Sequence, residues 1–481
     1  MKHEWNDFGN AERVIAKYGH RLRWVRDERK GGFTVYDDRK WEAFGADTTI
    51  RAFVWDVLKH LDEEEAGEYD DTGPLDSKGR ETPSERDKFL AWAKSQKSAG
   101  AVDSCMRVLN AHPGLLAWPG EFDRERFLLN FENGTMDTNT MEFAEHDPGD
   151  FQTRMMPVAY NPGADCPRWK AFLEETIPDA ATREYVQKVV GYTLTGRSNE
   201  KIIMWLYGPA NTGKSIVVNT LAKLFGQDYG VTANDNALRP KRGGGPSPEV
   251  HSMKGKRYVT TSETGHGEEI DEALVKRLTG GDTQNSRGLY QNESNWDPEC
   301  VIWVASNAFP QPRGDDDAIW GRFGPVEFTE AYGPDNPRRN PMLPQELEAE
   351  LEGMAAWAVE GLRMYLRDGL GDVPHVMQMT ATKFMDNADQ VRRFIFEAEE
   401  AGKINLTVDG QCVRTDLYKV YSEWAKVSGV GALGSRRFYE RLASVPGISR
   451  TDKMSSGKRY VSGVNLITAS WNAAPGWNGY P

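Results

Sequence analysis

Residues 208–215 read GPANTGKS and separate two segments of opposite character. The run IIMWLY before them (202–207) is short and continuously apolar, which predicts a buried strand. The run IVVNTLAKLF after them (216–225) spaces its apolar residues as a helix does. A strand, a glycine-containing loop and a helix in this order predict an α/β fold, with the loop at the helix N-terminus.

The loop fits the pattern G-x-x-x-x-G-K-S, whose glycines let successive backbone N–H groups surround a phosphate. We expect Lys214 to reach the β- and γ-phosphates of ATP and Ser215 to ligate Mg²⁺. The nucleotide would be held by the whole loop, namely Gly208, Pro209, Ala210, Asn211, Thr212, Gly213, Lys214 and Ser215. The alternative is a glycine-rich turn arising by chance, and the flanking strand and helix argue against it.

Two later runs also predict strands, RYVTTS at 257–262 and VIWVAS at 301–306, and a polar residue follows each of them. Strands alternating with helices predict a three-layer α/β sheet with its ligand site at the strand ends. Glu263 would orient the attacking water or hold Mg²⁺ through water, and Asn307 would bond the γ-phosphate or that water. Ser262 stands where many such ATPases carry an Asp, so the role of Glu263 stays open, with a solvated acid as the alternative.

Arg322 follows these strands in the segment DDDAIWGRF. An arginine that its own site does not need can act as a finger on the phosphates bound by a neighbouring subunit. An ordinary surface ion pair is the alternative for this residue. The predicted catalytic residues are therefore Lys214, Glu263, Asn307 and Arg322.

Length, charge and cysteine spacing limit the remaining possibilities. At 481 residues the chain is too long for one core, so we expect two to four domains. The four cysteines lie far apart, which speaks against a structural metal site or a disulfide framework and predicts a reduced cytosolic protein. No apolar run is long enough to span a bilayer, so no membrane contact is expected. The net charge of -13 argues against a protein coated with DNA, but it is compatible with a ring whose inner wall alone is basic.

The flanking regions predict further domains around the ATPase core. Residues 21–41 predict a β-hairpin around two glycines, and residues 347–362 space their apolar side chains as one long helix. From about residue 386 to 467, three helical patterns precede a strand pair, which is the order of a winged helix. The expected parts are an N-terminal α+β module (1–165), a helical linker or collar (166–200), the core with its following helix (201–372) and the winged-helix tail (373–481).

Several longer segments carry a family resemblance. FLLNFENGTMDTNTMEF (127–143), CPRWKAFLEETIPD (166–179) and VVGYTLTGRSNEK (189–201) look like one family's N-terminal module. VKRLTGGDTQNSRGLYQNES (275–294) looks like its motif between the second and third ATPase strands, and NAFPQPRGDDDAIWGRF (307–323) like its sensor Asn and finger Arg. With the phosphate loop, these segments resemble the superfamily 3 helicases of phage and plasmid primase-helicases, a group that includes the poxvirus D-type nucleoside triphosphatase.

The resemblance implies a superfamily 3 AAA+ core that forms a homohexameric ring and moves along single-stranded DNA, usually 3′ to 5′. A hairpin within about residues 283–296 would touch the strand in the central channel. Lys276, Arg287 and Tyr290 are the candidates for contacting phosphates or stacking on bases. A solvated helix face is the alternative for Lys276, and a core position is the alternative for Tyr290. No zinc-ribbon cysteines and no strand-borne Asp-x-Asp pair precede residue 200, so a primase would be a separate partner.

The expected function is ATP-dependent DNA unwinding in phage or plasmid replication, in the cytoplasm of a bacterial host. Its partners would be single-stranded or forked DNA, further copies of the chain, and a separate primase or replication initiator. The alternatives are an ATPase that loads or remodels proteins on DNA without unwinding, and an origin-binding module in which ATP controls assembly. The tail has a basic surface that would contact duplex DNA or a partner protein, and a solvated face is the alternative. The residues of this surface are Arg436, Arg437, Arg441, Lys453, Lys458 and Arg459.

Overall fold

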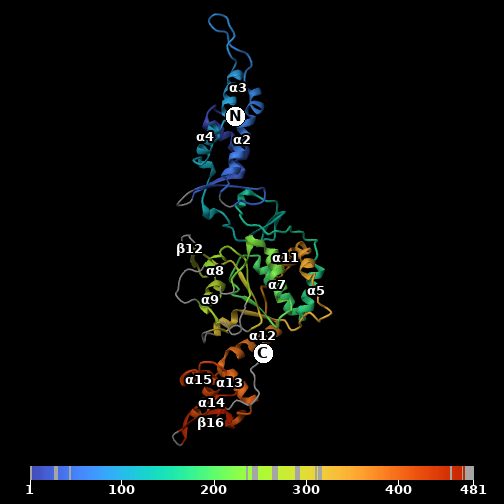
Figure 1. Cartoon of the computed structure of the whole chain (residues 1–481), viewed down its shortest axis with the longest axis vertical. Helices are drawn as coiled ribbons and strands as arrows, with labels where there is room; N and C mark the ends of the chain where they lie inside the picture. The colour runs from blue at the N-terminus through green and yellow to red at the C-terminus, as the bar shows by residue number, and fades with distance from the viewer. Residues whose placement is uncertain are drawn as a thin grey trace.

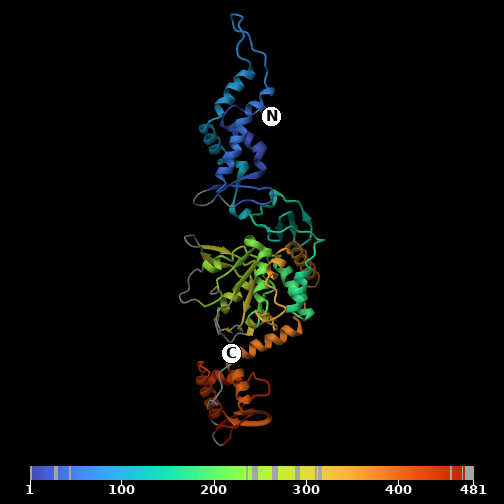
Figure 2. The ribbon, with the colours of Figure 1, turned by 45° about the vertical axis from the view of Figure 1, so that its right-hand side comes forward.

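The chain is elongated, and three parts follow one another along its long axis in chain order (Figures 1 and 2). A helical N-terminal part, a central α/β part and a C-terminal part each bury their own apolar residues. The multidomain α/β architecture expected from the sequence is therefore confirmed. This computed structural model describes residues 3–26, 31–42, 45–234, 237–240, 248–262, 269–287, 293–308, 311–312, 317–455, 458–468 and 470–471.

In the N-terminal part, helices pack around α2 and against a small sheet of order β2-β1-β3. Strands β1 and β2 are antiparallel with Leu22 opposite Val35, which confirms the hairpin predicted at 21–41. Ser84 begins α3 with a capping box that it shares with Asp87, so the sequence itself sets the start of this helix. The elements are α1 (Asp7–Tyr18), β1 (Leu22–Val25), β2 (Gly32–Val35), α2 (Asp47–Glu64), α3 (Glu85–Gln96), α4 (Ala99–Leu109) and β3 (Leu116–Ala117).

A second small sheet joins the N-terminal part to the central part. It consists of β4 (Leu128–Phe131), β5 (Gly134–Asp137) and β6 (Phe143–Ala144). Its buried residues belong to the same apolar cluster as those of the central part. The buried guanidinium of Arg257 donates hydrogen bonds to the carbonyl oxygens of Arg126 and Leu128, both at 2.7 Å, and to that of Leu194. The boundary expected at residue 165 therefore does not coincide with a break in packing.

Five parallel strands in the order β15-β7-β13-β9-β8 form the central sheet. Strand β7 lies between β13 and β15, with Ile203 opposite both Ile302 and Phe323. The sequence predicted β7, β9 and β13, whose apolar runs are buried on both faces, as parallel strands require. Strand β15 was not predicted and contains Pro325, which is tolerated because this strand is paired on one side only. The strands are β7 (Ile203–Tyr207), β8 (Gly230–Thr232), β9 (Tyr258–Ser262), β13 (Val301–Ser306) and β15 (Phe323–Glu327).

Helices cover both faces of this sheet, which gives the expected three layers. Met204 and Leu206 face the layer of α5, α6, α7, α10 and α11, whereas Ile203 and Trp205 face the layer of α8 and α9. The remaining central elements are α5 (Pro167–Thr176), α6 (Ala180–Thr193), α7 (Lys214–Tyr229), α8 (Pro248–His251), β10 (Glu269–Ile270), α9 (Glu272–Gly280), β11 (Gln284–Arg287), β12 (Glu293–Trp296), β14 (Gln311–Pro312), α10 (Leu343–Glu348) and α11 (Leu351–Asp368).

The single long helix predicted over residues 347–362 is wrong, because α10 ends at Glu348 and α11 begins at Leu351. The break gives Glu350 a contact that a continuous helix would not. Its carboxylate accepts hydrogen bonds from the backbone N–H groups of Arg168 and Trp169, at 3.0 and 2.9 Å. These N–H groups lie in the first turn of α5, where helix donors have no partner within the helix. The interruption therefore places the Glu350 carboxylate where it caps the N-terminus of α5.

Helix α12 (His375–Ala388) leads from the central part into the tail (Figure 2). It contacts the carboxyl ends of β15 and β7, since Lys383 pairs with Glu327 at 2.9 Å and the ring centres of Phe384 and Tyr207 lie 5.5 Å apart. The tail then contains α13 (Gln390–Glu400), β16 (Ile404–Val413), α14 (Arg414–Val427), α15 (Ser435–Leu442), β17 (Ser449–Ser455) and β18 (Lys458–Leu466). Its sheet has the order β16-β18-β17, so the predicted strand pair is joined by a third strand. Among the helices that the structure describes, none is both long and apolar enough to cross a membrane.

Helices α6 and α11 cross with their backbones in contact at two glycines. A Cβ atom on Gly191 would collide with the backbone at Gly361 and Leu362, and one on Gly361 would collide with the carbonyl group of Gln187. Any side chain would force these helices apart. Both helices contribute to the cluster that packs on the sheet.

We expect Gly191→Ala to lower the stability of the central part by about 1–3 kcal/mol, the usual cost of overpacking a core. Thermal and urea unfolding of the full chain would measure the loss. Gly100→Ala is the matched control, because Gly100 also lies in a helix but has no atom within 4 Å of an added Cβ. Equal stability of the two variants would contradict the close helix crossing.

Candidate functional site

The loop at 208–215 lies at the carboxyl end of β7 and leads directly into α7. Its backbone needs glycine at both ends, since Gly208 has a φ of 148° and Gly213 a φ of 98°. A Cβ on Gly208 would also collide with the carbonyl oxygen of Phe328. Asn211 takes a left-handed conformation with a φ of 62°, which asparagine tolerates better than most residues. The loop therefore has the backbone form that its sequence pattern predicts.

Lys214 folds back over this loop. Its ammonium donates hydrogen bonds to the carbonyl oxygens of Gly208 at 2.7 Å and Pro209 at 2.5 Å, and to Oγ1 of Thr212 at 3.2 Å. Burial lowers the pKa of Lys214 to about 8. A phosphate in the loop would give the ammonium a charged acceptor and would raise this pKa. The hydrogen bonds to the loop thus hold the Lys214 ammonium close to the N-terminus of α7.

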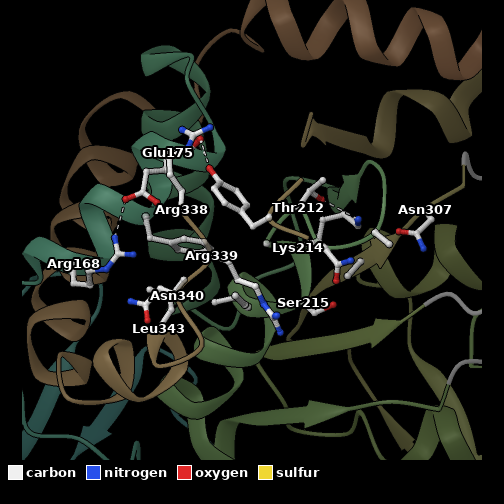
Figure 3. A pocket seen from close by; sticks show the side chains of 17 residues that line it. Arg168, Glu175, Thr212, Lys214, Ser215, Asn307, Arg338, Arg339, Asn340 and Leu343 are labelled. Atoms are coloured by element: carbon white, nitrogen blue, oxygen red, sulfur yellow. Dashed lines mark hydrogen bonds and ion pairs between the residues drawn. The ribbon is translucent and has the colours of Figure 1, made fainter. Parts of the chain in front are cut away.

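A cavity of about 480 Å³ opens in front of the loop. Figure 3 shows Lys214 and Ser215 near its middle, with Asn307 on one side and Arg168 and Glu175 on the other. Its walls come from the loop, from β13, from α5 and from the segment between β15 and α10, which we call the strap (residues 328–342). Besides the loop, the lining residues are Arg168, Phe172, Glu175, Ile216, Ala305, Asn307, Tyr332, Arg338, Arg339, Asn340 and Leu343.

Two of the predicted catalytic residues meet in this cavity. Asn307 directly follows β13, the strand beside β7, so its exposed side chain lies at the same sheet edge as Lys214. Glu263 follows Ser262 at the end of β9 and lies outside the described residues. Ser215, the predicted Mg²⁺ ligand, is exposed in the first turn of α7 and lines the cavity. Its hydroxyl is an oxygen donor of the type that Mg²⁺ prefers.

Arg322 lies at the amino ends of the strands, on the side of the sheet opposite to the loop and Asn307. It ends the 3-10 helix Asp317–Arg322, immediately before β15. Because β15 runs parallel to β7 with Phe323 opposite Ile203, Arg322 is about six strand positions, roughly 20 Å, from Gly208. Its Nε is buried and has no hydrogen-bond partner among the residues that the structure describes. The structure therefore does not bring Arg322 to the phosphate loop of its own chain.

The structure describes part of the region that is predicted to touch DNA. Strands β11 and β12 form an antiparallel hairpin with Gln284 opposite Trp296, within the range expected for a channel hairpin. Arg287 ends β11, where only its backbone is described, and Tyr290 lies outside the described residues. Lys276 is partly buried on α9, with Nζ 3.8 Å from the carboxylate of Glu272 one turn earlier.

The strap and α5 form walls of the site that were not predicted from the sequence. Arg168 of α5 pairs with the carboxylate of Glu175 in the same helix at 2.9 Å and with that of Glu346 in α10 at 3.2 Å. The backbone N–H of Tyr332 in the strap donates to the carbonyl oxygen of Asn211 at 2.7 Å, and its hydroxyl donates to that of Glu175 at 3.3 Å. The adjacent arginines in the strap were the one available sequence signal, since two cations in a Pro- and Asn-rich loop suit an anion site.

Comparisons with known proteins agree with the motif-based resemblance. The family model "D5 N terminal like" matches residues 11–178. The protein named "Putative helicase L207/L206" of Acanthamoeba polyphaga mimivirus is 26% identical over 330 residues, 64% of this chain and 34% of that protein. "Putative helicase 184R" of Invertebrate iridescent virus 6 is 24% identical over 287 residues, 55% of this chain and 29% of that protein. The chain thus spans about a third of the length of these relatives.

These relatives belong to viruses named for an amoeba and for invertebrates, which are eukaryotic hosts, so they do not show the phage or plasmid source expected from the sequence. Among solved structures, the apo structure of the NrS-1 C terminal region (305–718) covers 96% of this chain and 100% of that chain. Its TM-score is 0.52 at 12% sequence identity, which is a similarity of fold alone. The matched module and the helicase-named viral relatives agree with the resemblance to D5-like primase-helicases, and the solved structure shares the fold of this chain.

Proposed function

We propose that the chain is an ATP-dependent DNA helicase of viral or mobile-element replication that works as a homohexameric ring on single-stranded or forked DNA. The main supporting observation is the cavity in which the Gly208–Ser215 loop, with Lys214 folded over it, faces Asn307 of the adjacent strand. The names of the viral relatives support helicase activity. The β11–β12 hairpin, with Lys276, Arg287 and Tyr290 in or near it, is the proposed contact with the single strand, and the basic tail is proposed to be a winged helix that binds duplex DNA.

The residues of the cavity suit ATP and Mg²⁺. Backbone N–H groups at the start of α7 and the Lys214 ammonium would hold the β- and γ-phosphates, and Ser215 would ligate the metal. Mg²⁺, when bound, supplies charge neutralisation on the transferred phosphate. Asn307 would orient the attacking water or bond the γ-phosphate, and Glu263 would share this role from the end of β9.

The position of Arg322 favours an assembly in which each site is completed by a neighbour. About 20 Å of sheet separates this arginine from the loop of its own chain, beyond the reach of one side chain. A neighbouring subunit in a closed ring would bring its Arg322 edge against this loop, because head-to-tail contacts that close form rings. Arg322 would then stabilise the charge that develops on the phosphates.

Two other functions use the same ATPase site. A protein-remodelling ATPase would hydrolyse ATP on DNA without separating its strands, and an origin-binding module would bind duplex DNA through the tail with little turnover. A strand-displacement assay on a forked duplex, with ATP and with a non-hydrolysable analogue, separates these functions from a helicase. The helicase proposal requires displacement that depends on ATP hydrolysis.

Replacing Lys214 by Ala removes the cation expected on the transferred phosphate. We expect ATP hydrolysis to fall at least about a hundredfold while the thermal unfolding of the chain changes little. Lys223→Ala is the matched control, since Lys223 lies on the same helix but pairs with Glu348 on the surface. Near-normal hydrolysis by the Lys214→Ala protein would contradict the nucleotide site.

The lowered pKa of Lys214 predicts how nucleotide affinity depends on pH. In the free protein this ammonium loses its proton near pH 8, whereas a phosphate favours the charged form. Binding above about pH 8 therefore requires proton uptake, and the affinity should fall by up to about tenfold per pH unit. Calorimetric titration with MgADP between about pH 7 and about pH 9.5 measures this. The Lys214→Arg protein should give a flat profile, because a guanidinium does not titrate there.

Mixing two inactive variants tests the shared site. Arg322→Ala should bind ATP with its own loop but hydrolyse it very slowly, and Lys214→Ala should fail at its own loop. In mixed rings, interfaces that join an intact Arg322 to an intact Lys214 should restore part of the ATPase activity. As a control, the Lys214→Ala/Arg322→Ala double variant mixed with either single variant should restore no ATPase activity. Absence of recovery in mixtures that co-assemble would place Arg322 outside the neighbour's site.

A further inference from the structure

We propose that Arg339 of the strap binds the α- and β-phosphates of the nucleotide from within the same chain. This inference rests on the proposed nucleotide site and adds a second cation to it. It differs from the role of Arg322, which would act across a subunit boundary at the stage of hydrolysis. Arg339 would instead contribute to binding in every nucleotide state.

The strap is fixed to both sides of the cavity. At its start, the backbone N–H of Phe328 donates to the carbonyl oxygen of Tyr207 at 2.7 Å, beside Gly208. Tyr332 then bonds the phosphate loop through its N–H and α5 through its hydroxyl. At its end, the Asn340 amide donates to the Glu346 carboxylate at 2.8 Å. The residues between these anchors are held across the cavity.

The two adjacent arginines of the strap have different surroundings. Arg338 forms an ion pair with Glu330, and its guanidinium lies 5.6 Å from the centre of the Tyr332 ring. The side chain of Arg339 has no ion pair or hydrogen bond with any residue that the structure describes, although it is exposed and lines the cavity. Figure 3 shows Arg339 extending from the strap toward Ser215. Arg339 is therefore a guanidinium available to a ligand.

The charge around Arg339 suits an anion. Lys214 and Arg339 both line the cavity, and the carboxylate of Glu175, which also lines it, is already paired with Arg168 at 2.9 Å. A guanidinium offers several N–H donors in a plane that matches phosphate oxygens. Two cations with no free carboxylate among the described residues that line the cavity would attract a polyphosphate.

The cavity also has a direction. At one end Asn307 follows β13, where the terminal phosphate is expected (Figure 3). At the other end Asn340 and Leu343 line the cavity beside Arg339 (Figure 3), and we place the base at this end. Arg339 lies between these ends, so the phosphates nearest to the base are those within its reach. ADP and ATP share these phosphates, and Arg339 should bind both nucleotides.

Equilibrium titration of the full chain with MgADP and with a non-hydrolysable MgATP analogue tests the proposal. Arg339→Ala should raise both dissociation constants by a similar factor, about 10- to 100-fold, as expected for losing a hydrogen bond to a charged group. Arg339→Lys should restore part of the affinity, because it keeps the charge but not the planar donors. Arg363→Ala is the control and should change either constant by less than about threefold, because Arg363 pairs with Glu360 on the surface of α11 and does not line the cavity.

The outcomes separate the failure of this inference from that of the proposed function. Unchanged ADP affinity in Arg339→Ala, together with weakened binding in Lys214→Ala, would overturn the role of Arg339 and leave the nucleotide site intact. A loss confined to the ATP analogue would overturn the assignment to the α- and β-phosphates. Unchanged binding in both variants would refute the nucleotide site itself. Thermal unfolding of each free variant shows whether it is folded, and Arg339→Lys provides the test if Arg339→Ala is not.

Discussion

One buried cation secures the central sheet to the segment that precedes it. Arg257 is 2% exposed, and its guanidinium stays charged even though burial lowers its pKa. The cost of removing this charge from water is offset by three carbonyl oxygens from two separate segments and by the ring of Tyr229, whose centre lies 4.7 Å away. Arg257 immediately precedes β9, so its contacts fix the beginning of the strand whose other end leads to Glu263. The position of that strand end, and of the adjoining strand end at Asn307, depends on this anchoring.

The elements that could be predicted from the sequence are those whose pattern lies within one short, continuous segment. The strand, loop and helix around Lys214 have local patterns, because apolar periodicity and glycine spacing act over a few residues. The strap could not be predicted as a wall of the site, since its position depends on hydrogen bonds to Asn211 and Glu175, which are more than 100 residues away in sequence. The break between α10 and α11 was not predicted for the same reason, because Glu350 accepts from backbone N–H groups that lie 182 and 181 residues earlier in the sequence. Glu263 and Tyr290 lie outside the described residues and stay predictions.

The two ends of the parallel sheet carry different chemistry. All five strands run in one direction, so the loop and Asn307 both lie at the carboxyl ends of the strands. Arg322 lies at the amino ends. If Arg322 acts on a neighbour's nucleotide as proposed, the chain would offer its neighbours two complementary surfaces. Two-fold dimers pair like surfaces, whereas a closed ring pairs unlike ones. The proposed hexamer is thus the type of assembly that suits a parallel sheet with an arginine before its edge strand.

Helix α12 gives the tail its direction. Met377 and Phe384 are buried in the central clusters, whereas the buried residues from Val391 onward form a separate cluster. The orientation of the tail is therefore set where α12 rests on Tyr207 and Glu327. Tyr207 is the last residue before the phosphate loop, and Glu327 ends the edge strand that leads into the strap. A displacement of these strand ends would therefore change the direction of the tail, because α12 joins the two.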